Sequence, residues 1–447
     1  MNQKTKKPAI STTQKIVLSF FCVILIGGLL LSTPLASADG TVTPLIDALF
    51  TATTSVCVTG LVTVTTAFHW SLFGQILILF LVQLGGLGVA ALTMLFFLSI
   101  GKRLSLSSRK LIVDSFNLDS LGGITHFLRR VFLGTVIVEG IGALCYLPVF
   151  ISDYGIRKGI WFSVFHSVSA FCNAGLDLIG SDSLIPYAGS LWFNLVTMML
   201  IILGGLGFIV WRDLLYLLKG RKKRLSLHSR IVLRFSAFLI LFGSVCFFIF
   251  EYHNPDTIGG MSLPHKILAS LFQSVTSRTA GFAGMSQSAL TSQSVFIMLM
   301  LMFIGGSPVG TAGGVKTTTI FVLLATIRST IRGDRDTNIF GRRIPAGTIR
   351  KSLAVASVSL LTSLTALLLM FLFAEGSATD IVYEVVSAVG TVGLSRDFTA
   401  TLNFIGKCII LVCMFFGRIG PMSLVIALTA KSKNETVRLA EEDITVG

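Results

Sequence analysis

The chain has 447 residues, of which 53% are hydrophobic and only 13% are charged. So few charges cannot cover a water-soluble protein of this length, so the composition excludes a soluble globule and predicts an integral membrane protein. The formal net charge of +15 comes from basic segments that alternate with acidic loops, so it reports topology rather than binding to nucleic acid.

The apolar runs are of helix length, which predicts an all-α polytopic membrane protein. We expect it in the cell (plasma) membrane, with both termini and the basic segments in the cytoplasm. The N-terminal residues imitate a cleavable secretory signal, but we expect them to remain as the first helix. The predicted membrane-spanning helices cover residues 16–32, 71–100, 131–151, 190–218, 231–251, 294–328, 352–373 and 402–430.

Four shorter segments lie between pairs of these helices, and each is too short and too polar to cross a bilayer. They end at Gly60, Gly175, Gly281 and Gly393, and a pair of small residues follows at a similar distance in each copy, with Arg418 breaking the pattern in the fourth. Each copy therefore reads as a spanning helix, a re-entrant half-helix and a second spanning helix, an M1-P-M2 repeat. An even number of spans per copy makes the four copies parallel around a central pore, which disfavours inverted-repeat carriers.

The repeats divide the chain into residues 1–110, 111–230, 231–351 and 352–447. The second unit begins with a stretch that reads either as an amphipathic helix on the cytoplasmic membrane surface or as a plain linker.

The four loops after the half-helices are the candidate cation site. Irregular backbone at membrane depth is tolerated where it lines an aqueous path, and the negative ends of four half-helices with inward carbonyls would favour a cation. Close helix packing through small residues is the alternative, which the fourfold recurrence disfavours. The predicted cation filter comprises Val56, Cys57, Val58, Thr59, Gly60, Phe171, Cys172, Asn173, Ala174, Gly175, Ser277, Arg278, Thr279, Ala280, Gly281, Val389, Gly390, Thr391, Val392 and Gly393.

A second irregular segment, "FIGGSPVGTAGGVKTTT" at residues 303–319, contains five glycines, a proline and a lysine, which a continuous apolar helix cannot accommodate. We interpret it as an intramembrane gating loop on the cytoplasmic side of the filter; a simple kink is the alternative. Arg418 should project into the axial space beside it. The predicted gating residues are Gly305, Gly306, Ser307, Pro308, Gly310, Thr311, Gly313, Gly314, Lys316 and Arg418.

The elements "TSVCVTGL", "TSRTAGF", "GGSPVGTAGGVKT" and "FFGRIGP" occur in this order across the four repeats. With them the chain resembles the membrane subunits of the Ktr/Trk/HKT superfamily of potassium transporters, most of all the bacterial Ktr type. The resemblance implies potassium uptake through a filter lined by the four loop glycines. It also implies stimulation by Na+ and a homodimer whose protomers each have a pore. It implies no enzyme activity.

The resemblance further implies a cytosolic octameric ring of regulatory subunits that bind ATP or ADP and control the gating loop. This chain has neither a G-x-G-x-x-G motif after a strand nor a Walker A sequence, so the nucleotide site would lie on that separate chain. The ions K+ and Na+ are its expected ligands, and we predict no organic cofactor. A carrier for organic substrates would need inverted halves, and a membrane metalloenzyme would need clustered His, Asp or Cys, which the spacing does not offer.

Three further charged residues fall in apolar segments. Glu139 is expected to join two helices rather than to coordinate an ion. Arg278, within the third loop, should point away from the pore and brace the loop through carbonyl or carboxylate partners. Asp47 lies near the start of a half-helix, where the helix dipole favours a negative charge.

Overall fold

The computed structural model describes residues 12–89 and 124–420. The predicted Lys-rich N-terminus, most of the interfacial segment and the C-terminal tail lie outside these residues, as do the last parts of the predicted spans 71–100 and 402–430. The regular secondary structure of the described residues is helical, apart from one short hairpin.

In chain order, the bounds of the elements are α1 Thr12–Leu31, α2 Leu45–Cys57, α3 Thr66–His69, α4 Leu72–Leu87, α7 Ile124–Cys172, η1 Ile185–Tyr187, α8 Leu191–Leu206, α9 Phe208–Leu218, α10 Leu227–Glu251, α11 Leu263–Thr276, α12 Ser292–Phe303, α13 Thr317–Ile331, β1 Asn338–Ile339, β2 Arg342–Arg343, α14 Ala346–Phe373, α15 Ala378–Gly390, η2 Thr399–Thr401 and α16 Phe404–Ile419.

Four of these helices, α1, α7, α10 and α14, are long and apolar enough to cross a membrane. The longest, α7, is two helical arms that meet at Gly155, where φ is 75° and ψ is 170°. Only glycine adopts such a conformation without strain, so the chain reverses there. The second arm therefore ends inside the molecule, at Cys172.

The second helix ends at a glycine with positive φ in the first, second and fourth predicted copies, and in the third copy it is interrupted. The expected uninterrupted helix over 190–218 is wrong, because α8 and α9 meet at 98° across Gly207. The equivalent glycines Gly88 and Gly420 end α4 and α16, and all three have φ between 88° and 90°. In the third copy the break is longer, and residues 304–316 separate α12 from α13 without forming a helix. The predicted irregular segment is therefore present.

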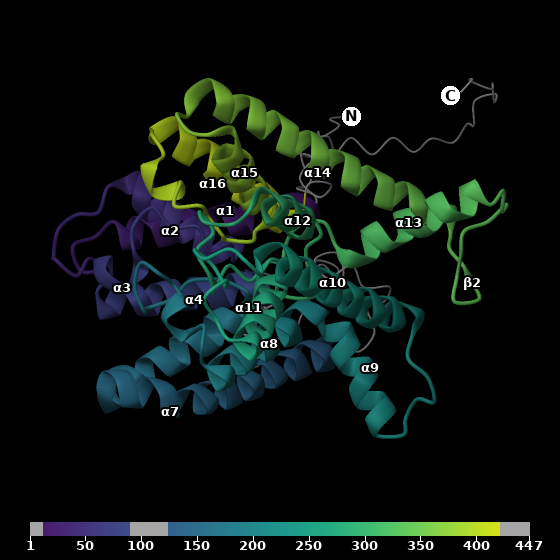
Figure 1. Cartoon of the computed structure of the whole chain (residues 1–447), viewed down its shortest axis with the longest axis horizontal. Coiled ribbons are helices and arrows are strands. Elements are labelled where there is room, and N and C mark those ends of the chain that lie inside the picture. Colours follow the sequence, from purple (N-terminus) through teal and green to yellow (C-terminus); the bar gives the residue numbers. More distant parts are fainter. Residues whose placement is uncertain (1–11, 90–123, 421–447) are drawn as a thin grey trace, which may run out of the picture.

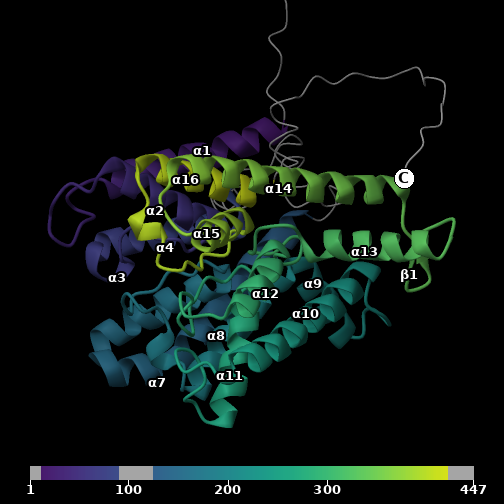
Figure 2. The ribbon, with the colours of Figure 1, turned by 45° about the horizontal axis from the view of Figure 1, so that its top comes forward.

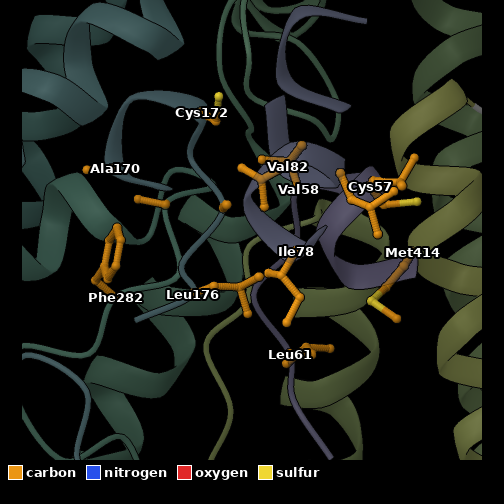
Figure 3. Packing of buried hydrophobic residues seen from close by; sticks show 14 of the residues in the cluster. Cys57, Val58, Leu61, Ile78, Val82, Ala170, Cys172, Leu176, Phe282 and Met414 are labelled. Carbon is orange, nitrogen blue, oxygen red and sulfur yellow. The ribbon is translucent and has the colours of Figure 1, made fainter. Parts of the chain in front are cut away.

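The short helices lie among the long ones, with α7 and α14 on opposite sides of the molecule (Figures 1 and 2). The β1–β2 hairpin and the basic loop after α9 lie at one end of the molecule, and the loop between α1 and α2 lies at the other (Figure 1). Side chains from several copies share one core, in which Val58 and Leu61 pack with Leu176, Phe282 and Met414 (Figure 3).

Candidate cation site

Each short helix ends in the same backbone turn. A residue in the left-handed conformation comes two positions before the loop glycine, and the glycine also has positive φ. In three loops the two hydrogen bonds of a Schellman cap close the turn, as in the first, where Val58 N donates to Ser55 O and Thr59 N to Thr54 O. The left-handed residues are Val58, Asn173, Thr279 and Thr391, and the glycines are Gly60, Gly175, Gly281 and Gly393. This recurrence is independent of the sequence pattern.

A small hydroxyl near the end of each short helix turns back onto its own loop. Thr54 accepts from Gly60 N at 2.9 Å, and Ser387 accepts from Gly393 N at 3.1 Å. Ser169 accepts from Leu176 N at 3.1 Å and donates to Leu176 O at 2.6 Å, whereas Thr276 donates to the Phe282 carbonyl at 2.7 Å. These hydroxyls hold each loop against its helix. They were not among the predicted site residues, although their recurrence five or six residues before the glycine was a readable signal.

The four loop glycines form a closed ring in chain order. A methyl group on each would crowd the carbonyl oxygen of the residue that precedes the glycine in the next copy, at 2.8 Å for Gly60 and Gly175 and 2.6 Å for Gly281. The fourth glycine closes the ring on the first loop. The glycine and carbonyl pairs are Gly60 with Ala174, Gly175 with Ala280, Gly281 with Val392, and Gly393 with Thr59. Four backbone carbonyls therefore gather where the four loops meet.

The first glycine of the small pair in three copies packs directly on a short helix. A methyl group on Gly85, Gly204 or Gly417 would overlap the carbonyl oxygen of Val56, Phe171 or Val389 respectively. These three carbonyls belong to the predicted filter, but they lie against the second helices. The small pairs therefore let the second helices approach the loops closely.

Gly204 and Gly205 offer a direct comparison of this packing. We expect Gly204→Ala to lower the free energy of unfolding by about 1–3 kcal/mol, because its methyl group would overlap the Phe171 carbonyl. Gly205→Ala should be tolerated, since the nearest atom to its methyl group would be 3.5 Å away, on Asn173. Thermal unfolding of the two purified variants in detergent measures the difference, and equal midpoints would contradict it.

The segment 304–316 lies directly against the loops. Thr311 Oγ1 is 3.2 Å from the Phe171 carbonyl oxygen and 3.3 Å from the side-chain amide of Asn173. A methyl group on Gly313 would overlap the Thr391 hydroxyl. The predicted gating residues and the predicted filter residues are thus in contact.

Backbone bonds attach this segment to the break between α8 and α9. Ser307 N and Thr311 N donate to Gly205 O and Gly204 O, at 2.9 and 3.2 Å, and Phe208 N donates to the Val309 carbonyl at 2.8 Å. Pro308 and Gly310 pack against Gly207. Within the segment, Gly305 N donates to Val315 O, and Thr317 N donates to Gly306 O. Residues 304–316, called the plug below, are therefore an ordered, hydrogen-bonded segment between two helices and not a kink within one helix.

Arg418 joins three copies at this plug. Its Nη1 donates to the Thr311 carbonyl, and its Nη2 donates to the carbonyls of Gly85 and Gly86. These carbonyls lie in the last turn of α4, where Gly85 O also accepts from Gly88 N at 3.2 Å, and a cation at a helix C-terminus is favourable. Lys316 does not reach the loops but donates to Ala312 O and Gly313 O within the plug, at 2.5 and 3.3 Å.

The residues that precede the left-handed positions are Cys57, Cys172, Arg278 and Gly390. Arg278 donates to Ser236 Oγ on α10 at 3.2 Å, so it is directed to a neighbouring helix, as expected, but its partner is a hydroxyl instead of a carbonyl or carboxylate. Cys172 Sγ lies 3.8 Å from Glu139 Oε1.

Two other charged residues join helices. Gln83 of α4 donates to Glu139 of α7 at 3.1 Å, so Glu139 connects two helices as predicted. Asp47 forms an ion pair at 2.7 Å with Lys407 of α16. The sequence had suggested only the helix dipole as the reason for Asp47.

Comparisons with known proteins cover nearly the whole chain. The TrkH family, described as "Cation transport protein", matches residues 2–437. The chain is 38% identical to the potassium/sodium uptake protein NtpJ of Enterococcus hirae, over 100% of this chain and 99% of that protein. It is also 38% identical to the Ktr system potassium uptake protein B of Bacillus subtilis, over 97% and 96% of the two chains.

The fold also matches a solved structure. The crystal structure of the potassium transporter TrkH from Vibrio parahaemolyticus superposes with a TM-score of 0.74 at 17% identity, over 96% of this chain and 87% of that one. This likeness confirms a helical, multi-pass membrane protein. The relatives are ion transporters, so the prediction that the chain is not an enzyme is also confirmed.

Proposed function

Because this chain belongs to the TrkH family of cation transport proteins, we propose that it takes up potassium ions across the cell membrane through the centre of the ring of four loops. The ring carries the proposal: four carbonyls, each from the residue before a loop glycine, meet at one place, and each lies against the next copy. Oxygen dipoles arranged in this way can replace the hydration shell of a monovalent cation. Sodium is the proposed second ion, because the similar NtpJ is named for both.

In this proposal the chain consists of four parallel M1-P-M2 repeats, with α2, the second arm of α7, α11 and α15 as pore helices. The plug of residues 304–316 is the gate, and Arg418 holds it closed. The fixed positive charge of Arg418 beneath the loops would also oppose a cation leaving them. The contacts that support this role are its bonds to the plug and to α4.

The proposal includes a cytosolic regulatory ring that binds ATP or ADP, since this chain has no nucleotide-binding motif. It also includes a homodimer in which each protomer keeps its own pore. The basic hairpin and the basic loop after α9 share one end of the molecule (Figure 2), which supports a cytoplasmic location for that end and for both termini.

Rubidium uptake tests the function directly. We expect the chain, produced with its cognate regulatory subunit in a host deficient in potassium uptake, to restore growth at low potassium and to accumulate ⁸⁶Rb⁺. Purified protein in liposomes should show the same flux, and K+ should compete with it more strongly than Na+. Absence of flux despite folded protein in the membrane would overturn the proposal.

A further inference from the structure

Glu384 is a fully buried carboxylate on α15, in the middle of the fourth short helix. One of its oxygens accepts from Ser395 Oγ at 2.8 Å, and the other accepts from the Thr399 hydroxyl. Among the described residues, no Lys, Arg or His forms an ion pair with it. Burial of a carboxylate destabilises the folded protein unless hydrogen bonds satisfy its oxygens, so these two bonds stabilise the packing of Glu384 against the loop.

These bonds hold the chain immediately after the loop glycine. Ser395 comes two residues after Gly393, and its hydroxyl also accepts from the amides of Phe398 and Thr399 at 3.1 and 3.3 Å. The segment from Ser395 to Thr399 is thus folded around one hydroxyl that Glu384 anchors from inside.

The neighbouring Arg396 secures the same segment from outside. It pairs with Asp380 of α15 at 2.8 Å and donates to the carbonyls of Gln287 and Ser288, in the third copy, at 2.9 and 3.1 Å. Two carboxylates on one helix therefore clamp the exit of the fourth loop.

The other copies have no carboxylate at the equivalent position. Three residues before the hydroxyl that closes each loop lie Thr51 in the first copy, His166 in the second and Gln273 in the third, where Gln273 Nε2 donates to Gln287 Oε1 at 2.7 Å. Thr51 and His166 bond to carbonyls of their own helices, those of Asp47 and Phe162. The fourth loop is also the one whose carbonyl at Val392 faces Gly281 and whose glycine closes the ring on Thr59. A shift of this loop would change two of the four contacts between a loop glycine and the carbonyl of the next copy.

We propose that Glu384 is a positioning residue that sets the selectivity of the ring for K+ over Na+, by fixing the exit of the fourth loop through Ser395 and Thr399. This inference rests on the proposed function. The bonds, rather than the charge, are what Glu384 supplies. A glutamine can remake both, because a hydroxyl accepts a hydrogen bond as well as it donates one.

The test compares Glu384→Leu with Glu384→Gln in the ⁸⁶Rb⁺ flux assay in liposomes, with K+ and Na+ as competitors. We expect Glu384→Leu to reduce the preference for K+ over Na+ by about fivefold, and Glu384→Gln to stay close to the original protein. Ser395→Ala and Thr399→Val remove one bond each, so each should lose part of the preference for K+ over Na+. When either is combined with Glu384→Leu, the loss should be smaller than the sum of the two separate losses. Glu375→Leu, the same change at an exposed residue just before α15, is the matched control.

The ratio of the competition constants for K+ and Na+ separates positioning from folding, because a loss of folded protein lowers the ⁸⁶Rb⁺ flux without changing either constant. An unchanged ratio in Glu384→Leu, or in both single-bond variants if Glu384→Leu does not fold, would overturn the inference. So would a Glu384→Gln variant as defective as Glu384→Leu, because the charge would then be what matters. If the unsubstituted protein carries no Rb⁺, the proposed function itself fails.

Discussion

Replacing Arg418 by glutamine should raise the flux of Rb⁺ about tenfold in the absence of activating nucleotide and should remove most of the dependence on the regulatory subunit. Arg418 bonds to the plug at Thr311 and to the end of α4 at Gly85 and Gly86. A hydrogen bond to a charged group contributes about 1.5–3 kcal/mol, and 1.4 kcal/mol is a factor of ten in an equilibrium. Loss of one such bond is therefore enough to shift a two-state plug by this amount.

The measurement is Rb⁺ flux into liposomes with and without the regulatory subunit and nucleotide. Arg350→Gln, at an exposed position in the first turns of α14, removes a charge without touching the plug and should change nothing. Arg418→Lys keeps the charge but cannot span three carbonyls with one ammonium group, so it should fall between the two. Equal basal flux in Arg418→Gln and the original protein would refute a gating role.

The place of Arg418 could be predicted from the repeats, but its partners could not. Aligning the four copies put it where the others have Gly86, Gly205 and Gly306, and that position does lie beside the plug. Two of its acceptors, Gly85 O and Gly86 O, lie where α4 ends at Leu87, and nothing in an apolar run such as "LGGLG" indicates a break. A glycine costs a helix only about 1 kcal/mol, so the sequence alone favours one long span there. At Gly207 the positive φ accompanies close packing against the Pro308 carbonyl of the plug.

The same distinction holds in the loops. The positions of the loop glycines followed from sequence spacing, and they do come together in one ring. The directions of the side chains near these glycines could not be predicted from the sequence, because they depend on which hydrogen-bond partners the other copies place nearby. The hydroxyl of Ser387 could face an ion or its own backbone, and it turns back to Gly393 N. Arg278 could find a carbonyl or a hydroxyl, and Ser236 was one of many candidates on the neighbouring helix.

Placing alanine at Gly393 should abolish uptake. The residue has φ of 94°, a conformation that side chains other than glycine rarely adopt. Its methyl group would also overlap the carbonyl oxygen of Thr59 in the first loop. Hydrogen bonds fix the backbone of both loops at this contact: Gly393 N donates to the Ser387 hydroxyl, and Gly60 N donates to the Thr54 hydroxyl. The overlap can be relieved only by moving a loop, so the arrangement of the four carbonyls would change.

We expect Gly393→Ala to fail to restore growth at low potassium and to give only background ⁸⁶Rb⁺ flux, with a loss in unfolding free energy of about 1–3 kcal/mol. Gly140→Ala is the matched control, because that glycine is exposed on a helix and no atom lies within 4 Å of the added methyl group. The variant protein should remain in the membrane, which detergent extraction and size-exclusion chromatography would confirm. A Gly393→Ala protein that transports Rb⁺ at the original rate would show that the ions do not pass through the ring of loop glycines.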